Sequence, residues 1–135
     1  MAWNSKGDAL FNQGKYEEAI KAYDEAIRID PKLVLALYNK GRALNAQGKY
    51  DDAVKAYDEV IRLDPKLTVT WILKGIALNS LGKYDEAIKC FDDAIRLDPT
   101  YADAYYGKGL LLRDLNKTSE ANEAFAKAKE LGYSG

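Results

Sequence analysis

Few side chains in this sequence could do acid–base, nucleophilic or metal chemistry. The chain contains no histidine, which removes the commonest general base and the commonest metal ligand. Its single cysteine, Cys90, has no activating base nearby, which favours a small, partly buried thiol over a reactive one. The acid pairs Asp51-Asp52 and Asp92-Asp93 lack the spacing of a calcium loop and fit a solvated helix face. We therefore predict no catalytic residue, cofactor or metal, and no enzyme.

A short stretch, Gly-Lys-Tyr followed by two acids and alanine, recurs along the chain. It begins at Gly14, Gly48 and Gly82, which are 34 residues apart, and a degraded copy begins at Asn116. No serine or threonine follows the lysine and no strand pattern precedes it, so the stretch is not a phosphate-binding loop. Because glycine takes the left-handed conformation that closes a helix, we interpret the stretch as a turn between two helices. In the degraded copy, Asn116 tolerates that conformation and Thr118 is expected to cap the next helix.

The three prolines mark the other boundary of each repeating unit. Pro31, Pro65 and Pro99 are also 34 residues apart, and each follows an aspartate. Proline interrupts helical hydrogen bonding and disfavours helix at the residue before it, so each Asp-Pro pair ends a helix. Apolar residues between these boundaries recur at spacings of 3 and 4, which is typical of helices. The sequence predicts helices at about 2–13, 17–29, 34–47, 51–63, 68–81, 85–97, 102–115 and 118–131.

Composition limits the classes of partner. The chain has 135 residues, of which 30% are charged, yet its net charge is only −1, whereas nucleic acids and anionic membranes normally need a basic surface. It has no apolar run close to the roughly 20 residues of a membrane span, and its beginning lacks a signal-peptide pattern. We therefore expect no nucleic acid and no membrane among its partners, and a cytoplasmic location.

Charged residues recur with the same period on two surfaces. Acids precede bases by four residues on the second helix of each unit, which predicts exposed ion pairs such as Asp24–Arg28, each contributing roughly 0.2–0.5 kcal/mol. The first helix of each unit carries a lysine in the same register. This column could bind an acidic partner as a ladder, or each lysine could cover apolar surface and reach a neighbouring acid. Its members are Lys6, Lys40, Lys74 and Lys108.

Glycine also recurs inside the first helix of each unit, where it costs up to about 1 kcal/mol relative to alanine, so we expect close packing of the partner helix there. Around this glycine, each unit carries a large residue, a leucine, an alanine, an aromatic, a small apolar residue and a proline in the same register. In the first unit these are Trp3, Gly7, Leu10, Ala19, Tyr23, Ala26 and Pro31; the second unit has Val60 in place of the second alanine, and the fourth has Tyr133 in place of proline. This 34-residue pattern resembles the tetratricopeptide repeat.

The resemblance implies an all-α fold, a right-handed superhelical solenoid of four helix–turn–helix repeats with eight helices. It implies one domain, residues 1–135, with repeats at about 1–33, 34–67, 68–101 and 102–135. Members of this family usually bind peptides or proteins along a concave groove formed by the first helices, and they rarely catalyse reactions.

Helix geometry identifies the face that would line this groove, because residues at spacings of 3, 4 and 3 lie on one side of a helix. An exposed apolar patch with polar edges commonly marks an interaction site, although curvature could instead pack these side chains between repeats. We expect Ile72→Glu to abolish partner binding and leave the melting temperature nearly unchanged. The predicted binding residues are Leu35, Tyr38, Arg42, Asn45, Val69, Ile72, Ile76, Asn79, Tyr106, Leu110 and Arg113, with Met1, Asn4, Asp8, Phe11 and Asp103 on the same face.

Two functions are compatible with the sequence. The first is a scaffold that binds a peptide or protein segment in the groove. It would not be the chaperone carboxylate clamp of some tetratricopeptide proteins, because only Asn39 matches that clamp and Asp8 would repel a carboxylate. The alternative is self-association, as a homo-oligomer or a longer array, through a final helix left without a covering helix. The apolar face concerned is Ala121, Ala124, Phe125, Ala128 and Leu131.

Overall fold

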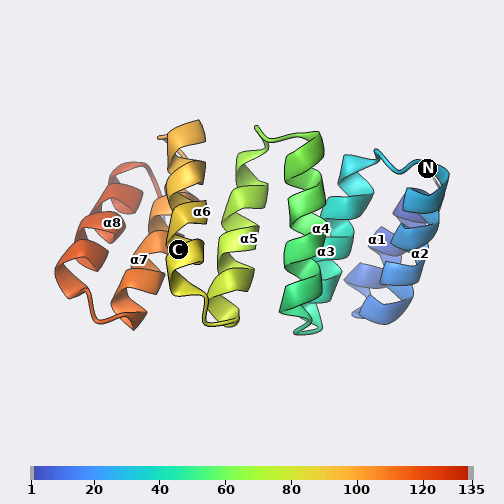
Figure 1. The fold of residues 1–135 in the computed structure, drawn as a ribbon, viewed down its shortest axis with the longest axis horizontal. Coiled ribbons are helices and arrows are strands. Elements are labelled where there is room, and N and C mark those ends of the chain that lie inside the picture. Colours follow the sequence, from blue (N-terminus) through green and yellow to red (C-terminus); the bar gives the residue numbers. More distant parts are fainter. Residues whose placement is uncertain (1, 134–135) are drawn as a thin grey trace. The chain divides into compact units, whose positions relative to one another are not determined.

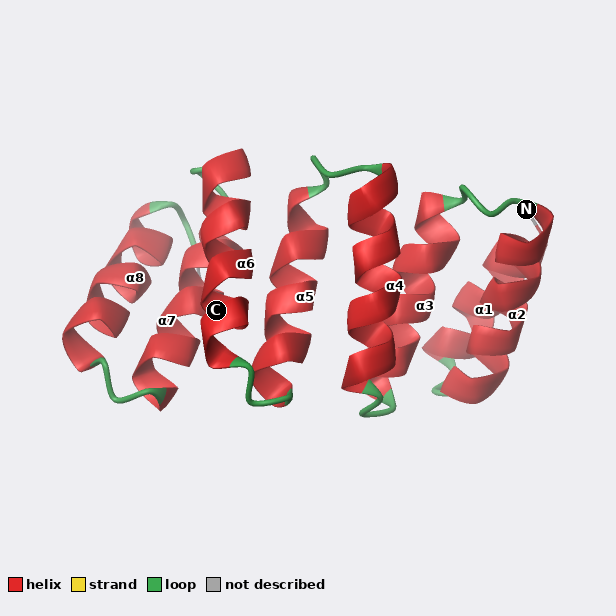
Figure 2. Cartoon of the chain, in the orientation of Figure 1, coloured by secondary structure: helices red, strands yellow, loops and turns green. Residues whose placement is uncertain are grey.

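The computed structural model describes residues 2–133, which form helices and no strands (Figures 1 and 2). The chain divides into two compact units, residues 1–65 and 66–135, each containing two helix–turn–helix repeats. The all-α prediction is confirmed, and every helix begins and ends within one residue of its predicted bounds. The first unit contains α1 (Ala2–Asn12), α2 (Tyr16–Ile29), α3 (Val34–Ala46) and α4 (Tyr50–Leu63), and the second contains α5 (Thr68–Ser80), α6 (Tyr84–Leu97), α7 (Ala102–Asp114) and α8 (Thr118–Glu130).

The turn within each repeat depends on one residue in the left-handed conformation. Gly14 has a φ of 77°, and its N–H donates to the carbonyl of Phe11 at 2.9 Å. The N–H of Lys15 donates to the carbonyl of Leu10, also at 2.9 Å. These two bonds satisfy carbonyls that the end of α1 would otherwise leave without partners. The same conformation recurs, as predicted, at Gly48, Gly82 and Asn116, with φ values of 78°, 77° and 64°.

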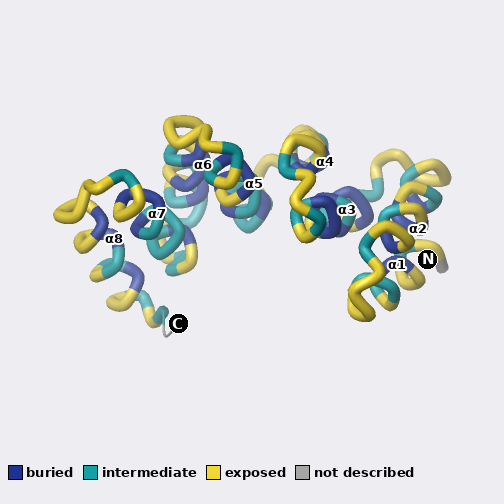
Figure 3. Tube along the Cα trace, turned by 90° about the horizontal axis from the view of Figure 1, so that it is seen from below, coloured by how far each residue is buried: buried dark blue, intermediate teal, exposed yellow. Residues whose placement is uncertain are grey.

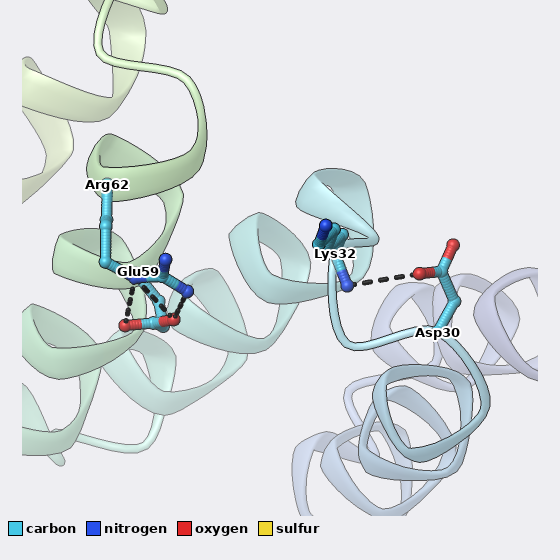
Figure 4. Close-up of polar contacts among 4 residues, drawn as sticks. All are labelled: Asp30, Lys32, Glu59 and Arg62. Atoms are coloured by element: carbon cyan, nitrogen blue, oxygen red, sulfur yellow. Dashed lines mark hydrogen bonds and ion pairs between the residues drawn. The ribbon is translucent and has the colours of Figure 1, made fainter.

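The Asp-Pro pairs end the second helix of a repeat, as predicted. Asp30 follows α2 in an extended conformation, with a φ of −137°. Its carboxylate accepts a hydrogen bond from the N–H of Lys32 at 3.1 Å (Figure 4). Asp98 makes the equivalent bond to the N–H of Thr100 at 3.1 Å. Aspartate thus stabilises the link by imitating a backbone turn with its side chain.

The ion pairs on the second helices differ from the prediction. Arg28 pairs with Glu25, three residues earlier, and Arg62 pairs in the same way with Glu59 (Figure 4). Asp24, which was expected to pair with Arg28, instead contacts Lys40 on α3 at 2.6 Å. The predicted pairing was wrong here because a lysine of the following repeat competes for the same acid.

The core of each unit lies between paired helices, where the buried segments face one another (Figure 3). The glycines inside the first helices contact aromatic rings of the second helices, as predicted. A Cβ atom placed on Gly7 would lie 2.4 Å from Cε1 of Tyr23, and one on Gly109 would lie 2.6 Å from Cε1 of Phe125. Glycine is therefore required at these positions, because any side chain there would displace a packed aromatic ring.

The last helix departs from two predictions. Thr118 does not cap α8: it is the first helical residue, Lys117 takes the N-cap position, and no side chain makes the capping bond. The predicted uncovered apolar face is largely covered, because Ala121, Ala124 and Ala128 are buried. Phe125 and Leu131 are partly buried.

The outer side of α8 is polar where the corresponding side of earlier helices is apolar. Ile20 of α2 packs against a cluster that includes Ala43 of α3. The matching position of α8 holds Asn122, which is exposed. Likewise Ile95 of α6 adjoins residues of α7, and its counterpart in α8 is the exposed Lys129. A helix docking on α8 would therefore bury less apolar surface than one docking on α2 or α6.

Candidate interaction site

Two helices of the second unit line an apolar hollow of about 470 Å³, which we call the α5–α7 hollow. Half of its twelve lining residues are ones that the sequence predicted to bind a partner. The structure brings together side chains that lie one repeat apart because α5 and α7 take the same position in successive repeats. The predicted residues in the lining are Val69, Ile72, Ile76, Asn79, Tyr106 and Leu110.

The predicted residues of this unit differ in exposure. Ile72 is 5% exposed and belongs to the core, whereas Ile76, one turn later on α5, is 41% exposed. The expectation that Ile72→Glu would leave the melting temperature unchanged is therefore wrong, since it would bury a carboxylate. Ile76 is the better position for testing the surface. Arg113 is exposed near Asp114 at 3.9 Å and is not part of the lining.

Several lining residues were not predicted as binding residues. The floor includes Phe91 of α6, which is 2% exposed, and Gly107 of α7. Gly107 stands where earlier repeats have Ser5, Asn39 and Leu73, so the missing side chain was a signal in the sequence. The remaining unpredicted lining residues are Leu73, Tyr101 and Tyr133.

Tyr133 reaches the hollow because α8 ends differently from α2, α4 and α6. Gly132 has a φ of 98°, and the N–H of Tyr133 donates to the carbonyl of Ala128 at 2.9 Å. The Tyr133 ring then stacks on that of Tyr106, with centroids 4.2 Å apart and planes 18° apart. Burial raises the pKa of Tyr133, and Tyr106 and the Asp103 carboxylate raise it further. The sequence signal was glycine followed by tyrosine in place of Asp-Pro.

The corresponding face of the first unit is closed by polar contacts. Asp8 accepts a hydrogen bond from the Tyr23 hydroxyl at 2.7 Å and another from Nδ2 of Asn39 at 3.0 Å. Burial, followed by this bond to Asp8, raises the pKa of Tyr23 well above its usual value. The guanidinium of Arg42 lies 4.7 Å from the ring centroid of Phe11, a cation–π contact.

The other predicted residues of the first unit lie on α3. Leu35 is 55% exposed, and Tyr38 and Asn45 are partly buried. Asn39, the single residue that matched the carboxylate clamp, is 6% exposed and bonded to Asp8. Met1, which the sequence placed on the same face, lies outside the described residues.

The lysine column contacts neighbouring side chains within each unit. Lys40 pairs with Asp24 at 2.6 Å, and Lys108 pairs with Asp92 at 2.7 Å. Lys6 lies 5.1 Å from the centroid of the Trp3 ring. These contacts agree with the interpretation that each lysine covers apolar surface and reaches a nearby acid or ring.

Other chemistry-bearing groups add no second site. Cys90 is 4% exposed in α6, as a small buried thiol would be. Residues 2–133 contain no cluster of three or more acids and cysteines able to hold a metal ion. None of the described helices is both long enough and apolar enough to cross a membrane.

Comparison with known proteins identifies the repeat. Models of the tetratricopeptide repeat match residues 4–67 and 102–131, and a TPR repeat model matches residues 75–116. No curated protein matches the sequence.

Solved structures agree with this match. The crystal structure of MamA is 28% identical, with 93% of this chain and 74% of that chain covered and a TM-score of 0.85. MamA 41-end from Desulfovibrio magneticus RS-1 is 26% identical, with 96% of this chain and 73% of that chain covered and a TM-score of 0.89. TTC0263, a thermophilic TPR protein of Thermus thermophilus, is 21% identical, with 97% of this chain and 73% of that chain covered and a TM-score of 0.84. At this identity the similarity shows the fold alone. The fold is a solenoid of helix–turn–helix repeats, and the chain belongs to the tetratricopeptide repeat family.

Proposed function

We propose that this chain is a protein-interaction scaffold that binds a peptide or protein segment at the α5–α7 hollow. Tetratricopeptide repeat proteins generally bind protein partners and are generally not enzymes. The observation that carries the proposal is the exposure of apolar side chains around one concave site, with Ile76 41% exposed at its edge. Apolar lining with a few polar groups is typical of surfaces that bind another molecule.

Packing between repeats explains only part of this face. Ile72 is buried and contributes to the core, as the packing interpretation requires. Ile76 and Leu110 line the hollow from opposite helices, and neither is buried. Asn79 provides an amide at the edge, suited to hydrogen bonding with a partner's backbone. We therefore assign the exposed part of this face to partner binding and the buried part to stability.

On the first unit, we propose that α3 presents a partner-contacting surface of its own. Leu35 is 55% exposed and Arg42 is also exposed, and Tyr38, Arg42 and Asn45 would contribute polar groups. A chaperone carboxylate clamp is not favoured here, because Asn39 already donates to Asp8 and a ligand carboxylate would approach that negative charge.

Catalysis and cofactor binding are not part of the proposal. The chain has no histidine, and Asp103, the acid in the lining of the hollow, makes no hydrogen bond or ion pair within residues 2–133. Self-association through α8 is the weaker alternative, since the exposed Asn122 and Lys129 replace isoleucines there.

We also propose that the four repeats form one folding domain. Pro65, at the boundary of the two units, keeps the same register as Pro31 and Pro99. A single cooperative thermal transition, with equal midpoints from circular dichroism and tryptophan fluorescence, would support this. Two separated transitions would contradict it. A cytoplasmic location is likewise a proposal, which fluorescence microscopy of the tagged chain in its native cell checks.

The proposed binding face is tested with a matched pair of variants. Ile76→Gln replaces an exposed apolar contact with a neutral helix-forming residue, and Lys89→Gln does the same to an exposed charge elsewhere in the unit. Proteins retained from native lysate by immobilised wild type should also be retained by Lys89→Gln and lost with Ile76→Gln. Equal retention by all three would contradict the assignment of this face.

A further inference from the structure

A second hollow adjoins the α5–α7 hollow and differs from it in chemistry. It has a volume of about 530 Å³ and is lined by both ends of the fourth repeat. We call it the acidic hollow, because its charged lining residues are Asp98 and Asp103 and no lysine or arginine lines it. The two hollows share Tyr101, Asp103 and Tyr133. An apolar site and an acidic site are therefore continuous on one surface.

The apolar side has room for a large side chain. Because Gly107 has no side chain, the Phe91 ring packs directly against the backbone of α7 and forms the floor of the hollow, since a Cβ atom there would lie 2.6 Å from Cε1 of that ring. Tyr106 already accepts one stacked ring, that of Tyr133. A volume of about 470 Å³ exceeds what a single aliphatic or aromatic side chain fills, so part of the flanking segment would also enter.

The acidic side has one uncommitted carboxylate. Asp98 is used by the chain itself, since one of its oxygens accepts bonds from the N–H and the hydroxyl of Thr100 at 3.1 and 2.7 Å. Asp103 is exposed in the first turn of α7, and within residues 2–133 its carboxylate makes no hydrogen bond or ion pair. An exposed acid beside an apolar surface attracts a cation that arrives with an apolar group.

Resting on the function proposed above, we propose that this surface selects a partner segment with a lysine or arginine close in sequence to a large apolar residue. The apolar side chain enters the α5–α7 hollow between Ile76, Tyr106 and Leu110. The cation lies over the shared edge, beside Asp103. The experiment distinguishes two competing occupants. One is a segment whose large apolar residue has only neutral or acidic residues beside it, and the other is a second copy of this chain.

The test starts from a phage library displaying random nine-residue peptides, selected on the immobilised full chain. We expect enriched peptides to combine phenylalanine, tryptophan or leucine with a lysine or arginine within three positions. The most enriched peptide is then synthesised with a fluorescent label, and its affinity is measured by anisotropy. A second peptide carries methionine in place of its basic residue.

Three variants separate the parts of the proposal. Asp103→Asn should weaken the basic peptide about five- to tenfold and leave the methionine peptide unchanged, which isolates the pairwise contact. Glu86→Gln, an exposed acid of α6 outside the lining, is the matched charge control and should stay within twofold. Ile76→Gln should weaken both peptides about tenfold, and circular dichroism verifies that all variants fold.

Each result has a defined meaning. Enrichment of apolar peptides without basic residues, or an unchanged affinity in Asp103→Asn, overturns the charge selection while the proposed function stands. Peptides that bind wild type and Ile76→Gln equally, or no enrichment at all, contradict the proposed function and this inference with it. Sedimentation showing that the chain dimerises, with dimerisation blocked by Ile76→Gln, would assign the surface to a second copy.

Discussion

The two units use the same three repeat positions in opposite ways. In the first unit these positions form a hydrogen-bonded cluster closed over by its own side chains. In the second unit they hold an apolar side chain, an aromatic ring and a glycine, and the surface is hollow. The polar set is Asp8, Tyr23 and Asn39, and the apolar set, 68 residues later, is Ile76, Phe91 and Gly107.

The comparison shows that an exchange of three side chains accompanies a change from a polar cluster to an apolar hollow within an unchanged scaffold. Removing one member of the polar set alone would leave a buried hydroxyl, amide or carboxylate without its partner, which costs about 1–3 kcal/mol. Replacing all three avoids that cost, because no polar group is left. The helices keep their bounds and turns in both units, so the difference lies in side chains.

The largest expected effect comes from the ring beneath the α5–α7 hollow. Phe91→Ala removes a side chain that is 2% exposed and should lower the free energy of unfolding by about 3–5 kcal/mol. Urea denaturation followed by circular dichroism measures this. Tyr84→Ala, on the same helix but 42% exposed, is the control and should cost less than about 1 kcal/mol. If Phe91→Ala lowers the free energy of unfolding by less than Tyr84→Ala does, Phe91 is not part of the core.

Exchange of the apolar set for the polar set tests the comparison directly. Phe91→Tyr alone should cost about 1–3 kcal/mol, because its hydroxyl would face Ile76 and find no acceptor. Combining it with Ile76→Asp and Gly107→Asn recreates the polar set in the same register. We expect the triple variant to be more stable than the sum of its single changes predicts, since contacting residues are not additive.

The same triple variant should also lose partner binding, because Gly107→Asn adds a side chain at the floor of the hollow, against the ring at position 91, and Ile76→Asp removes its apolar edge. Urea denaturation of the three single variants and the triple variant gives the coupling energy. Additive losses would show that the polar cluster of the first unit depends on surroundings other than its three members. Peptide binding that survives in a folded triple variant would contradict the location of the site.

The sequence was sufficient for the scaffold and only partly sufficient for the site. Helix bounds were predictable because glycine and Asp-Pro determine the backbone locally. Four of the five lining residues of α5 were predictable from helix periodicity, all except Leu73, but the exposure of Ile76 and the burial of Ile72 depend on contacts with other helices. Tyr133 could not be placed on Tyr106 from sequence, because the direction of the chain after α8 is a tertiary property. Periodicity likewise predicted Asp24–Arg28 and missed Lys40, which belongs to another repeat.

Alkaline pH should affect the two units differently. Burial raises the pKa of Tyr23 and of Tyr57, both in the first unit, and their counterparts in the second unit are phenylalanines. Below the unfolded pKa of about 10, both states keep the phenolic proton. Above it the unfolded chain loses protons that the folded chain retains, so the free energy of unfolding falls. The slope is at most about 1.4 kcal/mol per pH unit for each tyrosine.

Denaturant melts between pH 9 and 11.5 measure this slope, with Tyr23→Phe/Tyr57→Phe as the comparison. At pH 8 the double variant should be less stable than wild type, because Tyr23→Phe removes the hydrogen bond to Asp8. As the pH rises, the double variant should lose less stability than wild type. All other groups, including Tyr133, are identical in both proteins, so the difference in slope reports Tyr23 and Tyr57. Parallel slopes would show that neither hydroxyl is protected by folding.

The smallest effect is expected where the units are alike. Lys40 and Lys108 occupy the same repeat position and pair with Asp24 and Asp92 at nearly equal distances, 2.6 and 2.7 Å. Lys40→Met and Lys108→Met keep most of the aliphatic stem, so each should cost less than about 1 kcal/mol, and the two costs should agree. The difference in free energy of unfolding between each variant and wild type should shrink in 1 M NaCl, where the Debye length is about 3 Å. If only one variant loses stability, the two units also differ on this surface. If neither does and an acidic partner is lost instead, the lysines serve binding, and the ladder interpretation replaces the structural one.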